Sequence, residues 1–165
     1  MTLILDGYNV IGALDRYRNA GNFEATRDLL INDAAKAAGW TGREILVVFD
    51  AHRSPEPERN VRLAGGALRV VYTSFGESAD DVIERLLEGI EGPRTVYTAD
   101  FALQRTALAR GAVRAAPREF GELLDELPAL TRHPETRHRF SIGDHLSPEI
   151  RARLEDIRRR GPGAR

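Results

Sequence analysis

Apolar runs of strand length recur along this chain and alternate with segments of helical periodicity. The runs are residues 3–5, 44–50, 68–73 and 94–98, with a short fifth one at 112–115. The run at 44–50 is continuously rather than alternately apolar, which is typical of a strand covered on both faces, as in a parallel sheet. Apolar residues at helical spacing occupy residues 23–38, 79–87, 101–110 and the segment opened by Pro117. In the first of these segments the apolar stripe is formed by Phe23, Leu29, Leu30, Ala34 and Ala37. This alternation predicts a three-layer α/β/α domain around a central, mainly parallel sheet.

The composition excludes several classes of protein. A formal net charge of -1 argues against coating nucleic acid by charge alone, although it permits a local basic patch beside an acidic one. The absence of cysteine excludes disulfides, zinc–thiolate sites and thiol nucleophiles, so any metal must bind through oxygen or imidazole. No signal peptide and no apolar run of membrane-spanning length is recognised. We expect a soluble, cytoplasmic protein.

The character of the chain changes after Pro128. Residues 131–140 are polar and rich in arginine and histidine, and Ser147-Pro148 is typical of a helix start. The chain finishes with three arginines and a Gly-Pro-Gly segment. We therefore expect an α/β domain over residues 1–128 and a basic C-terminal extension over residues 129–165, with one helix and a disordered end.

Aspartates follow the first four apolar runs. They are Asp6, Asp50, the pair Asp80 and Asp81, and Asp100. Parallel strands end at the same edge of a sheet, where open α/β folds bind ligands, so these carboxylates should gather in one cleft. Like charges in a cleft repel, and a divalent cation such as Mg²⁺ relieves the repulsion through oxygen ligands. Any single aspartate here could equally be a turn former or a helix cap.

Asp80 and Asp81 are neighbours at the start of a helix that Ser78 can cap. Adjacent side chains on a helix point in different directions, so one aspartate should face the cleft while the other stabilises the helix N-terminus. Asn9 has two equal interpretations, as a hydrogen-bond partner of a carboxylate or metal-bound water, or as a turn residue.

Other polar and aromatic residues are candidates for contacting a nucleic-acid chain. His52, Arg53 and Arg59 lie in a segment, residues 52–60, that we expect to be a loop at the rim of the cleft, and Gln104 and Arg105 follow Asp100 by one helical turn. Each arginine could contact a phosphate or simply be a solvated charge. Tyr8 and Tyr72 could stack bases or pack in the core, and Trp40 is expected to pack. A basic run at residues 132–139 could engage RNA or be a solvated linker.

Three other families that place aspartates after strands fit less well. A haloacid-dehalogenase-type phosphatase needs a second aspartate two positions after the first, where this chain has Tyr8. A phosphorelay receiver needs a lysine after its last strand, whereas the only lysine is Lys36. A dinucleotide-binding domain needs a G-x-G-x-x-G segment after a strand, and none is present.

The segments LILDGYNVIGA, VVFDAH, VVYTSFGESADDVIERL and VYTADFALQ resemble the NYN-domain proteins of the PIN-like nuclease superfamily, above all the bacterial YacP-like branch. The likeness runs from about residue 3 to residue 127 and is weaker in the arginine-rich tail. It implies a PIN-like α/β/α fold, endoribonuclease activity, and Mg²⁺ or Mn²⁺ held by acidic residues. It also implies that the substrate is mRNA and that the ribosome is a partner.

The resemblance carries over to individual positions. It assigns the motif aspartates to Asp6, Asp50, Asp80 and Asp100 and the motif asparagine to Asn9, with Thr98 and Glu77 as supporting residues. The sequence thus predicts a metal-dependent endoribonuclease in which Asp6, Asp80 and Asp100 hold the metal. The alternative is a non-catalytic RNA- or ribosome-binding module on the same scaffold.

Overall fold

A six-stranded sheet forms the centre of the protein. The structure, a computed structural model, describes residues 1–50 and 58–128, and residues Met1–Pro128 form one compact unit. The strands are β1 (Thr2–Asp6), β2 (Glu44–Phe49), β3 (Arg59–Leu63), β4 (Leu68–Tyr72), β5 (Arg94–Tyr97) and β6 (Val113–Ala115), in the order β3-β4-β2-β1-β5-β6. All neighbouring strands are parallel except β3 and β4, which are antiparallel.

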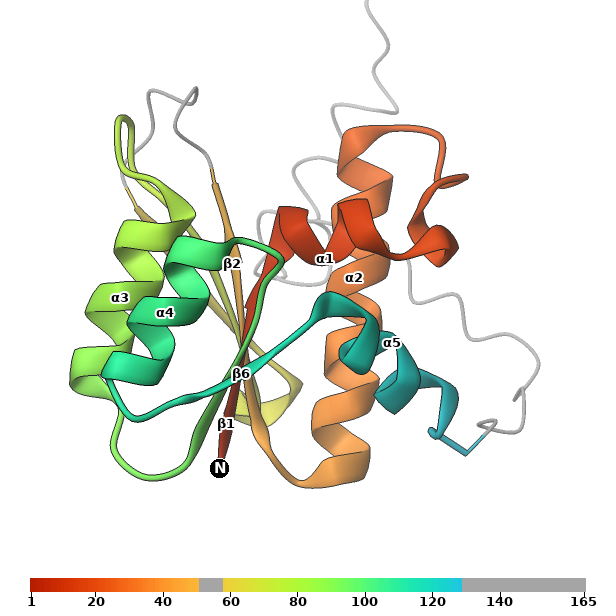
Figure 1. The fold of residues 1–165 in the computed structure, drawn as a ribbon. Helices are drawn as coiled ribbons and strands as arrows, with labels where there is room; N and C mark the ends of the chain where they lie inside the picture. Colours follow the sequence, from red (N-terminus) through yellow and green to blue (C-terminus); the bar gives the residue numbers. More distant parts are fainter. Residues whose placement is uncertain (51–57, 129–165) are drawn as a thin grey trace, which may run out of the picture. The chain divides into compact units, whose positions relative to one another are not determined.

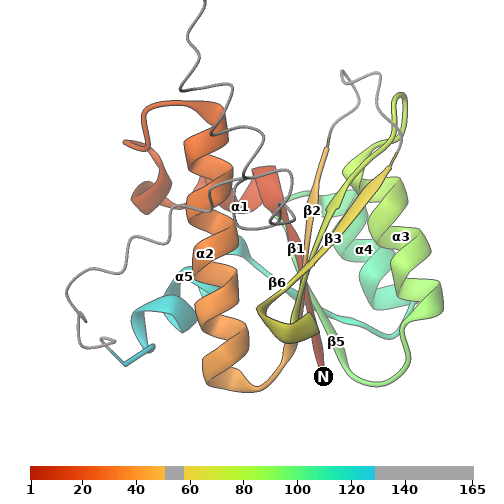
Figure 2. The same ribbon diagram turned by 180° about the vertical axis from the view of Figure 1, so that it is seen from behind.

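Helices cover both faces of the sheet. They are α1 (Gly7–Ala13), α2 (Phe23–Thr41), α3 (Ala79–Gly89), α4 (Phe101–Ala109) and α5 (Pro117–Asp125), with short 3-10 turns at Asp15–Tyr17 and Ala64–Gly66. Figures 1 and 2 show α3 and α4 on one face and α1, α2 and α5 on the other. The predicted three-layer α/β/α architecture with a mainly parallel sheet is confirmed.

Alternate residues of each central strand enter different cores, which explains the continuous apolar runs. In β1, Leu3 and Leu5 pack in the core on the α2 and α5 side, whereas Ile4 packs on the α3 and α4 side. In β2, Val47 and Val48 divide in the same way. Because both faces are buried, the interior positions of these strands favour apolar side chains.

The register aligns the strand ends that position the candidate site. Asp6 at the end of β1 pairs with Val48, and Phe49 at the end of β2 pairs with Tyr72 at the end of β4. The antiparallel strand β3 begins at this same edge, because its first residue, Arg59, pairs with Tyr72. The carboxyl edge of the parallel strands therefore also carries the start of β3.

Two elements were not anticipated from the sequence. Residues 7–13, for which the sequence pattern predicted no helix, form α1, which is stabilised by the Asp6 cap and by burial of Val10. The expected loop at residues 52–60 is wrong at its end, because Arg59 and Asn60 belong to β3. The exposed, polar pattern of β3 is that of an edge strand, which lacks the apolar run used to recognise the others.

The predicted apolar stripe of α2 is only partly correct. Leu30, Ala34 and Ala37 are buried as expected, but Phe23 and Leu29 are 72% and 42% exposed. Phe23 is the first residue of the helix. Trp40, expected to pack, is 49% exposed near the other end of the same helix.

Several predictions fall on residues outside those that the structure describes. They concern His52, Arg53, the basic run at 132–139 and the helix expected after Ser147. Within the described ranges, no helix is both long and apolar enough to cross a membrane.

Candidate active site

Asp6 is the most deeply enclosed carboxylate at the carboxyl edge of the sheet. It ends β1, is 3% exposed and caps α1. Its Oδ2 accepts hydrogen bonds from Asn9 Nδ2 at 2.6 Å and from Thr98 Oγ1 at 3.0 Å, and its Oδ1 accepts one from the Asn9 backbone N–H at 3.3 Å. These donors fix the orientation of the carboxylate before any ligand binds.

Asn9 joins two segments that are far apart in the sequence. Its side-chain nitrogen donates to Asp6, while its side-chain oxygen accepts from the backbone N–H of Ala99 at 3.2 Å. Of the two interpretations left open by the sequence, the hydrogen bond to a carboxylate is therefore the observed one. Asn9 ties α1 to the loop between β5 and α4.

Thr98 and Asp100 continue this network. The Thr98 hydroxyl donates to Asp6 and accepts from the backbone N–H of Asp100 at 3.0 Å. Asp100 caps α4 through its Oδ1, which accepts from the backbone N–H of Leu103 at 2.9 Å. Gln104 donates to the carbonyl oxygen of Thr98 at 2.8 Å, so it supports this loop from the first turns of α4.

Asp80 and Asp81 divide their roles as the sequence predicted. Asp81 forms a capping box with Ser78 at the start of α3, and these hydrogen bonds lower the pKa of Asp81. Burial, followed by the charges of Asp6 and Asp100, raises the pKa of Asp80 to about 6. Asp80 is therefore the member of the pair whose pKa is affected by the other site carboxylates.

Negative charge accumulates at this edge of the sheet. Burial raises the pKa of Asp6 despite its three hydrogen bonds, and the charge of Asp100 adds to the effect. Over residues 1–50 and 58–128, no three acidic or histidine side chains are placed to hold one metal ion together. The oxygen chemistry of Asp6, Asp80 and Asp100 nevertheless fits Mg²⁺ or Mn²⁺, because hard cations take oxygen ligands and Mg²⁺ usually retains several waters.

The remaining predicted site residues lie around this group. Asp50 follows β2 at the same edge and is half-buried. Arg59 is exposed, with its guanidinium 4.6 Å from the centre of the Tyr72 ring. Arg105 is exposed on α4 and lines a shallow surface hollow with Ala102.

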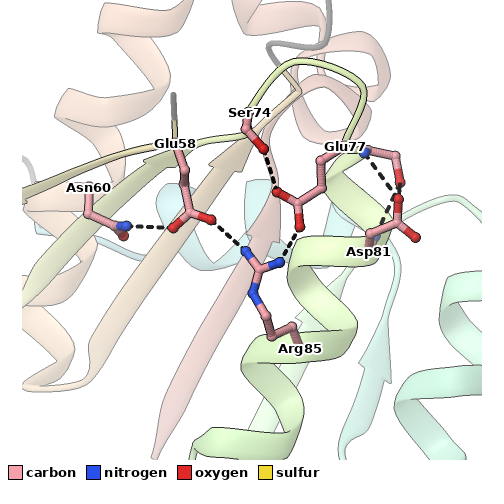
Figure 3. Close-up of polar contacts among 7 residues, drawn as sticks. Glu58, Asn60, Ser74, Glu77, Asp81 and Arg85 are labelled. Carbon is pink, nitrogen blue, oxygen red and sulfur yellow. Dashed lines mark hydrogen bonds and ion pairs between the residues drawn. The ribbon is translucent and has the colours of Figure 1, made fainter. Parts of the chain in front are cut away.

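An arginine-centred network beside the site was not anticipated from the sequence (Figure 3). Arg85 on α3 pairs with Glu58 and also with Glu77, which accepts a hydrogen bond from Ser74 at 3.0 Å. Glu77, which the family resemblance implied to be a supporting residue of a metal site, is paired with Arg85 in this structure. The network links the residues just before β3 to the loop between β4 and α3.

The fold and this group of carboxylates define a nuclease-like α/β domain of the NYN type. The YacP-like NYN domain model matches residues 3–159, and the chain belongs to this family. It is 35% identical over 168 residues to the protein named "Uncharacterized protein YacP" of Bacillus subtilis (strain 168), covering 95% of this chain and 96% of that protein.

Solved structures give the same relationship. The crystal structure of Rae1 (YacP) from Bacillus subtilis is similar with a TM-score of 0.63 at 28% identity, over 77% of this chain and 75% of that chain. The crystal structure of a mutant of the same Bacillus subtilis protein gives a TM-score of 0.64 at 29% identity, over 76% of each chain. The resemblance noted in the sequence is confirmed at the level of family and fold.

Proposed function

We propose that this protein is a metal-dependent endoribonuclease that hydrolyses RNA phosphodiester bonds. The observation that carries the proposal is that Asp6, Asp80 and Asp100 lie at the carboxyl edge of the sheet, near enough to one another that the charges of Asp6 and Asp100 add to burial in raising the pKa of Asp80 to about 6. Uncompensated carboxylates repel the phosphates of RNA. Carboxylates in a site for RNA are therefore favourable only when a cation binds between them and the phosphates. Membership of a nuclease-like family supports the same conclusion.

The roles of the residues follow from their contacts. Asp6, Asp80 and Asp100 would hold Mg²⁺ or Mn²⁺, and Asp50 would be a further ligand or would orient one. A divalent cation held by these residues would supply activation of a water molecule and neutralisation of the phosphate charge. Asn9 and Thr98 hold the carboxylate of Asp6 in a fixed orientation. Arg59 and Arg105, together with His52 and Arg53, are proposed to contact the RNA backbone.

The family resemblance extends the proposal to mRNA as the substrate, to the ribosome as a partner and to the cytoplasm as the location. These proposals are tested by cosedimentation of the full chain with ribosomes, and by comparing cleavage of free mRNA with cleavage of ribosome-bound mRNA. Cleavage of free and bound RNA at equal rates, without cosedimentation, would remove the ribosome from the proposal.

The activity itself is tested with a pair of adjacent variants. Asp80→Asn removes a proposed ligand, and Asp81→Asn, its matched control, removes the same charge from the neighbouring cap. We expect cleavage of a single-stranded RNA by the wild type with Mn²⁺ or Mg²⁺ and none with EDTA. Asp80→Asn should lose cleavage and Mn²⁺ binding in isothermal titration, while Asp81→Asn retains both.

The alternative function, a non-catalytic RNA- or ribosome-binding module, predicts a different result. In that case RNA binding would be insensitive to Mn²⁺, and neither wild type nor variants would cleave. Equal cleavage by wild type and Asp80→Asn would also contradict the proposed role of the carboxylates.

A further inference from the structure

A row of four aromatic rings lies at the carboxyl edge of the sheet, beside the proposed site. Tyr8 is 5.5 Å from Phe23 and 5.4 Å from Phe49, and Phe49 is 5.6 Å from Tyr72, measured between ring centres. Phe49 is fully buried, Tyr8 and Tyr72 are half-buried, and Phe23 is 72% exposed. We call these four residues the aromatic row. Its most solvent-accessible ring is therefore Phe23.

Two arginines accompany the aromatic row. The guanidinium of Arg59 is 4.6 Å from the centre of the Tyr72 ring and that of Arg27 is 5.8 Å from it. Arg27 follows Phe23 by four residues on α2, so the two share a face of that helix. Among the described residues, neither arginine forms an ion pair. Their positive charges are available to an anionic ligand.

The row adjoins the proposed site through the strands that carry it. Phe49 follows Val48, which pairs with Asp6 in the sheet, and a Cβ atom on Gly7, the residue after Asp6, would lie 2.5 Å from the Phe49 ring. Phe23 also lines a hollow of about 220 Å³ together with Ile11, so a flat group stacked on its ring has space beside it. A ligand on this face must offer flat aromatic surfaces and negative charges at close spacing. Single-stranded RNA has both, whereas a duplex hides the faces of its bases.

We propose that the aromatic row is a binding subsite for single-stranded RNA, in which a base stacks on Phe23 while Arg27 and Arg59 contact the phosphates. The inference rests on the proposed function for its choice of RNA, and it names the strand state and the path by which the substrate approaches the carboxylates. It also accounts for Phe23, an exposed aromatic residue at a position where the sequence pattern predicted burial.

The test is a binding measurement that does not depend on cleavage. A fluorescein-labelled, non-self-complementary 12-nucleotide RNA is titrated with the full chain in EDTA, alone and annealed to its complement, and anisotropy is recorded. We expect the wild type to prefer the single strand. Stacking of one base on an aromatic ring is worth about 1–3 kcal/mol, so Phe23→Ala should weaken binding roughly 5- to 150-fold.

Matched variants separate stacking from general effects. Phe23→Tyr keeps a ring and should bind RNA with an affinity within about threefold of wild type. Arg27→Gln should lower the magnitude of the slope of log affinity against log salt concentration by the amount expected for about one lost phosphate contact. Trp40→Ala, which removes an exposed aromatic residue near the other end of α2, should bind like wild type.

Three outcomes would overturn the subsite: no binding of the single strand, equal binding by Phe23→Ala and wild type, or equal losses in Phe23→Ala and Trp40→Ala. Cleavage with Mn²⁺ is measured separately. If binding depends on the Phe23 ring but no cleavage occurs, the subsite is supported and the nuclease function is rejected. If cleavage occurs but binding does not depend on the ring, the nuclease function is supported and the subsite is rejected.

Discussion

The hydroxyl of Thr98 donates a hydrogen bond of 3.0 Å to the buried carboxylate of Asp6, across 92 positions of sequence. The same oxygen accepts from the backbone N–H of Asp100, so one side chain connects the ends of β1 and β5 to the start of α4. The contact lowers the pKa of Asp6 against the larger effect of burial, which raises it. Thr98 therefore helps to keep Asp6 ionised.

Replacing Thr98 by valine should destabilise the protein in a pH-dependent manner. Thr98→Val keeps the shape but leaves the Asp6 carboxylate without one donor and the backbone N–H of Asp100 without its acceptor, at a cost of about 1–3 kcal/mol in free energy of unfolding at neutral pH. Protonated Asp6 needs that donor less, so the loss should shrink toward acid pH. Thr98→Ser keeps the hydroxyl, and its smaller loss should not vary with pH. Urea unfolding from pH 4 to pH 8 measures both.

Gly7 should not tolerate a side chain. A Cβ atom at this position would lie 2.5 Å from two ring atoms of Phe49 and 2.9 Å from the carbonyl oxygen of Val48. Because Phe49 is fully buried, its ring has little room to move. Gly7→Ala should therefore cost about 1–3 kcal/mol in thermal or urea unfolding.

Gly12 provides the matched control in the same helix. A Cβ atom there has no neighbour within 4 Å. Gly12→Ala should stabilise the protein by up to about 1 kcal/mol through helix propensity. If Gly7→Ala and Gly12→Ala unfolded at the same denaturant concentration, the close approach of α1 to β2 would be wrong.

The network around Arg85 should contribute little to stability. The Arg85 side chain is 52% exposed, and its partner Glu58 is 32% exposed. Exposed ion pairs are worth about 1 kcal/mol or less, so Arg85→Ala should lower the free energy of unfolding by no more than that. At about 1 M salt, where the screening length is about 3 Å, the difference from wild type should largely disappear. A larger, salt-independent loss would show that Arg85 acts through packing instead.

The sequence was sufficient for the main architecture because burial on both faces leaves a continuous apolar run in the interiors of β1 and β2 and mostly apolar residues in β4 and β5. The pattern failed where elements lack that burial. Strand β3 is exposed at the edge, and α1 has seven residues and depends on its Asp6 cap and on packing of Val10. Phe23 had the spacing of a core residue, but spacing alone cannot tell where a helix extends beyond the sheet.

The candidate site was predictable as a set of strand-end aspartates, but its internal connections were not. The parallel arrangement alone implies that Asp6 and Asp100 share an edge. The bridging of Asn9 to Ala99 depends on the position of α1, which the sequence pattern did not indicate. The pairing of Glu77 with Arg85, eight residues away, depends on the conformation of the loop before α3.

The stability of the protein should depend on the ionisation of Asp80. Its pKa is raised to about 6 in the folded protein, chiefly by burial, above the value of about 3.9 for an unfolded chain. Between these values the folded state binds more protons than the unfolded state, so the contribution of Asp80 to stability falls as the pH rises from about 4 to about 6. Above a pH of about 6 the ionised carboxylate is destabilising.

Asp80→Asn should therefore stabilise the protein at neutral pH in EDTA, by about 1 kcal/mol once solvent screening is allowed for, and should flatten the pH profile between about pH 4 and about pH 6. Asp81→Asn should instead lower the stability of the protein at neutral pH. The lowered pKa of Asp81 reflects favourable hydrogen bonds to Ser78, and the variant loses them. Thermal unfolding in EDTA and in Mn²⁺ separates electrostatics from metal binding. Mn²⁺ should raise the unfolding temperature of wild type and Asp81→Asn but not of Asp80→Asn, and an equal rise in all three would place the cation elsewhere.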